Sequence, residues 1–133
     1  MFLVDTSVWI EVFGKSSRVR LEAEAPLDQI VTCLPIVQEV LQGFREEAPF
    51  RIARESLAAL PIVESPLTWE VFEMAAQLYR TARRSGLTVR SSVDCLIAAC
   101  AMRNDLTVLH FDRDFSLLAK ISPLRERRVT RIS

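Results

Sequence analysis

Residues 2–13, Phe-Leu-Val-Asp-Thr-Ser-Val-Trp-Ile-Glu-Val-Phe, open the chain and decide its fold class. The first three are apolar and are followed by Asp-Thr-Ser, which predicts a short buried strand that ends at a helix cap. A helix should follow, with Val8, Trp9, Val12 and Phe13 facing inward and a stop near Gly14. The chain therefore begins with a strand that leads directly into a helix.

The same alternation continues along the chain. Strands are predicted at residues 30–33, 62–63 and 107–109, with a fifth at 129–132. Helices are predicted from Pro35, over 49–60, over about 68–85, from Ser91-Ser92, and after Asp114. Strands that alternate with helices through short connections predict an α/β fold whose parallel sheet is covered on both faces. The order of the strands does not follow from this pattern.

Length and composition limit the possible classes of protein. A chain of 133 residues fits one domain, residues 1–133, and half of its residues are hydrophobic. It contains no uncharged apolar run long enough to cross a membrane, and its beginning lacks the basic region of a secretory signal. Three cysteines, Cys33, Cys95 and Cys100, lie in apolar runs and are expected to be buried thiols of a cytoplasmic protein. Because His110 is the single histidine, a Cys/His metal site is not expected.

The charge balance is neutral, with seventeen basic and seventeen acidic residues. Proteins that bind nucleic acids usually carry a basic excess, so the net charge argues mildly against that class. All the basic residues except Lys15 and Lys120 are arginine, which suits bidentate contacts with phosphate. Charge alone does not decide the function.

Four acidic residues lie close in sequence to the ends of the predicted strands or to the starts of the helices next to them. Asp5 ends the first strand, Glu39 lies one turn into the helix after the second, Asp94 begins the helix before the fourth, and Asp112 follows the fourth. In open parallel sheets ligands bind beyond the carboxyl ends of the strands. Four carboxylates at one edge repel each other unless a cation neutralises them, and hard oxygen ligands select Mg²⁺ or Mn²⁺. Such a cation would bind a phosphate oxygen and activate water.

Each acid also has an ordinary structural explanation. Asp5 is a normal helix N-cap, and Asp94 in a first turn is favoured by the helix dipole. Glu39 fits a solvated helix face, and Asp112 fits a polar turn. From spacing alone, the catalytic and the structural interpretations both remain open.

Four motifs, in order along nearly the whole chain, resemble those of the PIN domain and, within it, of VapC-type toxins of bacterial toxin–antitoxin pairs. Residues 3–10 resemble the N-terminal signature of that family, and residues 37–43 resemble its second motif, an acid on a helix followed by Gly. Residues 88–99 resemble the third motif, and residues 110–115 resemble the fourth.

This resemblance implies a three-layer α/β/α fold with a five-stranded parallel sheet of order 3-2-1-4-5. It implies a Mg²⁺- or Mn²⁺-dependent endoribonuclease that hydrolyses RNA phosphodiester bonds with metal-activated water. It also implies a homodimer and inhibition by a small VapB-type antitoxin. The RNA class, whether tRNA, rRNA or mRNA, is not indicated.

The resemblance also assigns residues to the site. Asp5, Glu39, Asp94 and Asp112 take the four acidic positions, with Asp5 and Asp94 as direct metal ligands and the other two acting through water or a second cation. Thr6 or Ser7 matches a hydroxyl that orients Asp5. Asp114 is either a fifth acid of the site or the cap of the next helix.

Several basic and aromatic residues have weaker assignments. Arg90 is expected either to contact a substrate phosphate or to pair with an acid. Trp9 and Trp69 are expected in the core or in an interface. Arg80, Arg83 and Arg84 share one polar helix face, which is more often a solvated surface than an RNA-binding track. For the basic residues near the end, contacts with RNA, with a partner subunit or with neither all remain open: Arg125, Arg127, Arg128 and Arg131.

Three other functions compete with the toxin hypothesis. A phosphotransfer domain with one Asp nucleophile would want a Lys near a strand end, and Lys15 and Lys120 are not placed there. The DxD pattern of aspartate phosphatases is broken by Ser7. A non-catalytic PIN-like interaction module would be favoured by loss of an acid, but all four are present. A nuclease outside a toxin–antitoxin system remains open.

Overall fold

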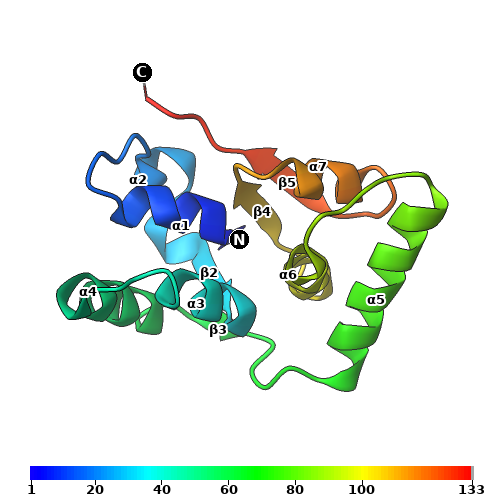
Figure 1. The fold of residues 1–133 in the computed structure, drawn as a ribbon, viewed down its shortest axis with the longest axis horizontal. Helices are drawn as coiled ribbons and strands as arrows, with labels where there is room; N and C mark the ends of the chain where they lie inside the picture. Colours follow the sequence, from blue (N-terminus) through cyan, green and yellow to red (C-terminus); the bar gives the residue numbers. More distant parts are fainter. Residues whose placement is uncertain (133) are drawn as a thin grey trace.

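The computed structural model describes residues 1–132 and contains a five-stranded parallel sheet (Figure 1). The strands are β1 (Phe2–Val4), β2 (Ile30–Cys33), β3 (Ile62–Val63), β4 (Thr107–His110) and β5 (Arg125–Arg128), in the order 3-2-1-4-5. In the register, Leu3 pairs with Val31 on one side and with Val108 on the other. The strand order implied by the family resemblance is confirmed.

Helices connect the strands and cover the sheet. They are α1 (Thr6–Phe13), α2 (Leu21–Glu24), α3 (Leu34–Leu41), α4 (Glu47–Ala58), α5 (Trp69–Arg84), α6 (Ser92–Arg103) and α7 (Arg113–Ala119). A 3₁₀ turn, η1 (Leu27–Gln29), precedes β2. Helix α3 packs against α1 and α4, whereas α5 packs against α6, and α6 also contacts α7 (Figure 1).

The central strands and α6 form the core. Leu3, Val4, Val108 and Leu109 are fully buried, as expected for central parallel strands covered on both faces. Helix α6 is buried along most of its length, because small side chains allow close packing: Cys95, Ala98, Ala99, Cys100 and Ala101 are all buried. This packing holds the first turn of α6, with Asp94, against the carboxyl edge of the sheet.

The fifth strand was predicted at residues 129–132, and that prediction is wrong. The strand is Arg125–Arg128, which pairs with β4 from Thr107↔Arg125 to His110↔Arg128. It is an edge strand with mostly exposed charged side chains, so it lacks the apolar pattern of a buried strand. Val129 is buried beyond the end of the strand, and Ile132 is 46% exposed, so these apolar residues did not mark a strand.

The sequence did not predict the short helix α2 or the turn η1, because four- and three-residue helices carry no periodic signal.

Ser133, the last residue of the predicted domain, lies outside the described residues. Within residues 1–132, no helix is both long and apolar enough to cross a membrane.

Candidate metal centre

Three aspartates lie close enough together to hold a metal ion. Oxygen atoms of Asp94, Asp112 and Asp114 all lie within 4.8 Å of one another. Asp94 stands in the first turn of α6, Asp112 is the N-cap of α7, and Asp114 is in the first turn of α7. Asp94 and Asp114 are buried, and Asp112 is partly exposed. The β4–α7 connection and the start of α6 therefore bring these carboxyls to one point.

The carboxyl of Asp94 is strongly perturbed. Burial is the main cause, followed by the charges of Asp112 and Asp5, and together they raise its pKa to about 9. A side-chain hydrogen bond with Asp112 raises the pKa of Asp94 further. At neutral pH the metal-free site therefore retains a proton, which a divalent cation would displace.

Asp5 uses its two oxygens differently. Oδ2 accepts hydrogen bonds from the Ser7 amide at 3.0 Å and from the Ser7 hydroxyl at 2.6 Å, so Asp5 is the N-cap of α1. Oδ1 is buried and has no hydrogen-bond partner among residues 1–132. Burial raises the pKa of Asp5 despite the Ser7 hydrogen bonds, and the charge of Glu39 adds to the effect. Asp5 Oδ2 thus has the structural role of capping α1. Asp5 Oδ1 is the oxygen that the site interpretation concerns.

The two adjacent hydroxyls orient two different acids. Ser7 binds Asp5, and its Oγ also accepts the Phe111 amide at 3.0 Å, which ties α1 to the residue before Asp112. Thr6 Oγ1 donates to Glu39 Oε1 at 2.8 Å. The expectation that Thr6 or Ser7 would lie at Asp5 therefore holds for Ser7. Glu39, partly buried on α3, is instead held by Thr6.

Arg90 lies directly beside the aspartates. Its backbone N–H donates to Asp114 Oδ2 at 2.9 Å. Its guanidinium lies 3.6 Å from Asp112 Oδ1 and 3.8 Å from Asp114 Oδ1, and its side chain is 61% exposed. Asp114 does not cap α7, because Asp112 accepts the Asp114 amide in that role. Asp114 is instead a buried acid of the group, with Arg90 as its counter-ion.

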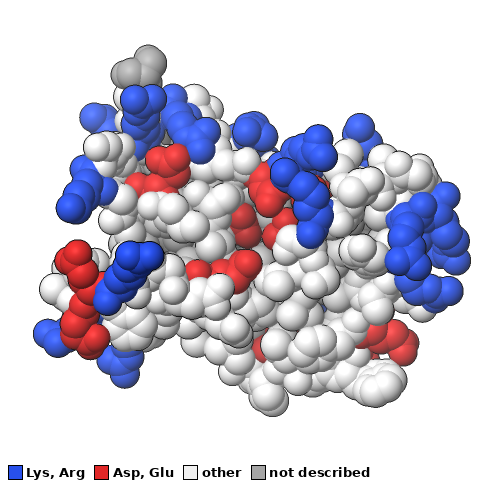
Figure 2. Space-filling view, viewed as in Figure 1, with Lys and Arg blue, Asp and Glu red and all other residues white. Residues whose placement is uncertain are grey.

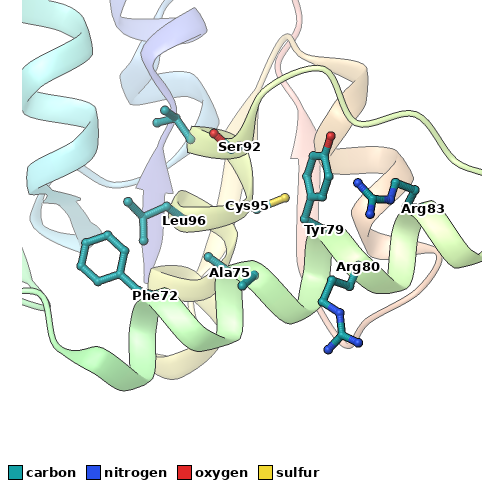
Figure 3. A pocket seen from close by; sticks show the side chains of 10 residues that line it. Phe72, Ala75, Tyr79, Arg80, Arg83, Ser92, Cys95 and Leu96 are labelled. Carbon is teal, nitrogen blue, oxygen red and sulfur yellow. The ribbon is translucent and has the colours of Figure 1, made fainter.

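The surface around the acids has a distinct charge pattern. In Figure 2 red carboxylate atoms gather in the middle of the face, between the α1–α3 side and the α6–α7 side, and blue basic side chains lie next to them. A pocket of about 340 Å³ is lined by Glu39 together with Leu34, Phe72, Val93 and Leu96, among others. A second pocket of about 450 Å³ lies between α5 and α6 and shares Phe72, Val93 and Leu96 with the first (Figure 3).

Sequence reasoning missed one buried network next to the site. His110, at the end of β4, is fully buried and contacts Glu126 and the amide of Asp112. The signal was a lone histidine at the end of an apolar strand, but nothing in the sequence indicated that Glu126 would lie opposite it.

The donor set fits a hard divalent cation. Buried oxygens of Asp5, Asp94 and Asp114 lack hydrogen-bond partners within the part of the chain described here. Buried polar atoms are normally paired, and carboxylate oxygens are the ligands that Mg²⁺ and Mn²⁺ prefer. This group lies at the carboxyl edge of the parallel sheet, where open α/β sheets bind their ligands.

Residues 2–121 match the family model of the PIN domain, and the chain belongs to this family. Among curated proteins it is similar to VapC ribonuclease Mb1587 of Mycobacterium bovis, with 37% identity over 94% of this chain and 96% of that protein. It is equally similar to ribonuclease VapC11 of Mycobacterium tuberculosis, with the same identity and coverage.

Solved structures of toxin–antitoxin proteins share the fold. VapBC-5 of M. tuberculosis is 26% identical, with a TM-score of 0.72 over 96% of this chain and 97% of that one. VapBC2 of Rickettsia felis, solved with a promoter DNA fragment, has a TM-score of 0.75 over 97% of this chain and 98% of that one, at 16% identity. The expected membership of the VapC group of PIN domains is confirmed.

Proposed function

We propose that this chain is a divalent-metal-dependent endoribonuclease and the toxin of a toxin–antitoxin pair. The observation that carries the proposal is the convergence of buried carboxyls whose oxygens lack hydrogen-bond partners among residues 1–132. The relatives named as VapC ribonucleases support RNA as the substrate. Residues 1–133 are proposed to act as one domain.

Asp94, Asp112 and Asp114 would hold the cation, with Asp5 and Glu39 beside them. The family resemblance made Asp5 and Asp94 the direct ligands and Asp114 a possible fifth acid; Asp112 and Asp114 are proposed as direct ligands with Asp94 because oxygens of these three lie within 4.8 Å of one another. When bound, Mg²⁺ or Mn²⁺ supplies Lewis acidity toward a phosphate oxygen and lowers the pKa of water. The clustered negative charge would be repulsive in an empty site, and a bound cation would relieve that repulsion.

The residues around the acids have separable tasks. Ser7 fixes the rotamer of Asp5, and Thr6 fixes that of Glu39, through hydrogen bonds of 2.6 and 2.8 Å. The exposed guanidinium of Arg90 can reach a substrate phosphate, since it is held on the acids only by contacts of 3.6 and 3.8 Å. Arg90 is therefore proposed to exchange its carboxylate partners for a phosphate when RNA binds.

The reaction is hydrolysis of a phosphodiester. Water attacks phosphorus, the bond to the 3′ oxygen breaks, and that oxygen takes up a proton. The products carry a 5′-phosphate and a 3′-hydroxyl. Attack by the ribose 2′-hydroxyl would instead leave a 2′,3′-cyclic phosphate.

Chelation with analysis of product ends tests this proposal. RNA cleavage should stop in EDTA and return with Mg²⁺ or Mn²⁺, and sequencing should find 5′-phosphate ends. Equal cleavage in chelator, or cyclic phosphate ends, would refute the metal mechanism. Absence of cleavage of tRNA, rRNA and mRNA alike would favour the non-catalytic interaction module.

Protein partners form the remaining part of the proposal. Solved neighbours include VapBC complexes, which supports a VapB-type antitoxin that places a basic or polar segment against the acids. A homodimer is proposed through the apolar face of α5, where Trp69 is 78% exposed and Phe72 is 51% exposed. Trp9, by contrast, is buried in the core.

A further inference from the structure

His110 is the only histidine of the chain and lies at the end of β4, two residues before Asp112. Its side chain is fully buried, so both ring nitrogens need partners inside the protein. Nε2 lies 3.0 Å from Glu126 Oε1 on β5. Nδ1 accepts the backbone N–H of Asp112 at 3.2 Å. Both nitrogens are therefore satisfied, and one of them binds the turn that carries the acids.

These contacts define the tautomer of the ring. Nδ1 faces an N–H donor and must be unprotonated, so the proton of the neutral ring is on Nε2 and is donated to Glu126. Ser116 Oγ, on α7, donates to the same Glu126 oxygen at 2.8 Å. Glu126 thus holds the imidazole from β5, and Ser116 holds Glu126 from α7.

The amides of the turn after β4 are bound by side chains. The Phe111 amide donates to Ser7, the Asp112 amide donates to His110, and the Asp114 amide donates to Asp112 itself. The backbone position of Asp112 consequently depends on the imidazole. The backbone position of Asp112 in turn places its carboxyl oxygen within 4.8 Å of carboxyl oxygens of Asp94 and Asp114.

We propose that His110, backed by Glu126 and Ser116, is a positioning residue that fixes the Asp112 turn in the geometry needed to bind the divalent cation. It touches neither metal nor substrate and acts through the Asp112 amide. The inference rests on the proposed function, because it assumes that the aspartates hold a metal. Outer partners of metal-ligating carboxylates commonly change metal affinity by about 10–100-fold.

Two conservative substitutions separate the two contacts of the ring. In His110→Asn the amide oxygen occupies the place of Nδ1 and can still accept the Asp112 N–H. In His110→Gln the amide extends to the place of Nε2 and can still reach Glu126, but no acceptor remains for Asp112. Titration with Mn²⁺ by calorimetry should show about tenfold or greater weakening in His110→Gln and less than threefold weakening in His110→Asn.

Variants of Glu126 provide a second test. They should lower the free energy of unfolding less than variants of His110, because the Glu126 side chain is 23% exposed. Glu126→Gln retains an acceptor oxygen for Nε2–H and should bind Mn²⁺ nearly as wild type. Glu126→Leu removes the acceptor and should weaken Mn²⁺ binding severalfold. Val108→Ala is the matched control: Val108 is fully buried on β4 and faces Glu126 in the register, but it is not part of the turn. It should lower the melting temperature without changing Mn²⁺ affinity.

Hydrogen exchange of the Asp112 amide tests the contact without metal. In the metal-free protein this amide should be protected in wild type and His110→Asn and should exchange faster in His110→Gln. Equal protection and equal Mn²⁺ affinity in the Asn and Gln variants would overturn the positioning role while leaving the proposed function intact. Wild-type protein that binds no Mn²⁺ would overturn the proposed function itself, and the metal part of this inference with it.

Discussion

Replacing Asp94 with Asn should stabilise the metal-free protein. Burial and the neighbouring charges raise the pKa of Asp94 to about 9 from an ordinary 3.8, so at pH 7 the native state retains a proton that the unfolded chain releases. Retaining it costs about 1.36 kcal/mol for each pH unit above 3.8, which is about 4 kcal/mol at pH 7. Asn is neutral in both states and avoids this cost. Because part of this shift comes from the charges of neighbouring carboxyls and not from Asp94 alone, this value is an upper limit.

Thermal unfolding in EDTA at pH 7 measures the effect. A gain of this order in a domain of this size corresponds to a rise in Tm of roughly 5–15 °C. Mn²⁺ should raise the Tm of the wild type and have little effect on the variant, because the ligand charge that binds the cation is absent. RNA cleavage should be abolished in the same variant.

Asp28→Asn is the matched control, since Asp28 is an exposed residue of η1 and is not one of the acids of the site. It should leave both the Tm and the response to Mn²⁺ unchanged. The reasoning is refuted if Asp94→Asn is no more stable than the wild type in EDTA, or if Mn²⁺ stabilises the variant and the wild type equally.

The remaining predictions concern pH, RNA binding and assembly. Because the native state holds Asp94 and Asp5 with raised pKa values, it binds more protons than the unfolded chain, so metal-free stability should fall as pH rises from about 4 to about 9, measured by urea unfolding in EDTA. A flat profile for wild type would contradict the burial of these acids. Arg90→Ala should raise KM for RNA more than it lowers kcat and should reduce the salt slope of binding by roughly one counterion; an unchanged KM and slope would leave Arg90 with a purely structural role. Phe72→Asp should convert a dimer into a monomer by light scattering, whereas a wild-type monomer would remove the dimer proposal. Expression of the wild type should arrest growth unless an antitoxin is co-expressed, and normal growth without one would leave a nuclease but not a toxin.

The sequence by itself determined the fold class and the edge of the sheet at which the acids gather. Apolar runs such as Phe2–Val4 and the helical stripe after Pro35 indicate which residues of a segment are buried. The spacing of buried residues distinguishes a strand from a helix. The carboxyl ends of parallel strands meet at one edge, so Asp5 and Asp112 could be placed together without coordinates. The strand order came from the family resemblance, because periodicity carries no information on which strands are neighbours.

The tertiary structure alone decided which groups pair across that edge. Adjacent Thr6 and Ser7 bind different acids, and Asp114 is a buried member of the group rather than a cap. The edge strand Arg125–Arg128 was hidden because all four of its side chains are charged and give no apolar pattern. Placement of β5 beside β4 in turn brings Glu126 to His110, sixteen residues apart in sequence. Hydrogen bonds between distant residues depend on how whole elements sit against each other within a few tenths of an ångström, and a local pattern of polarity cannot specify that distance.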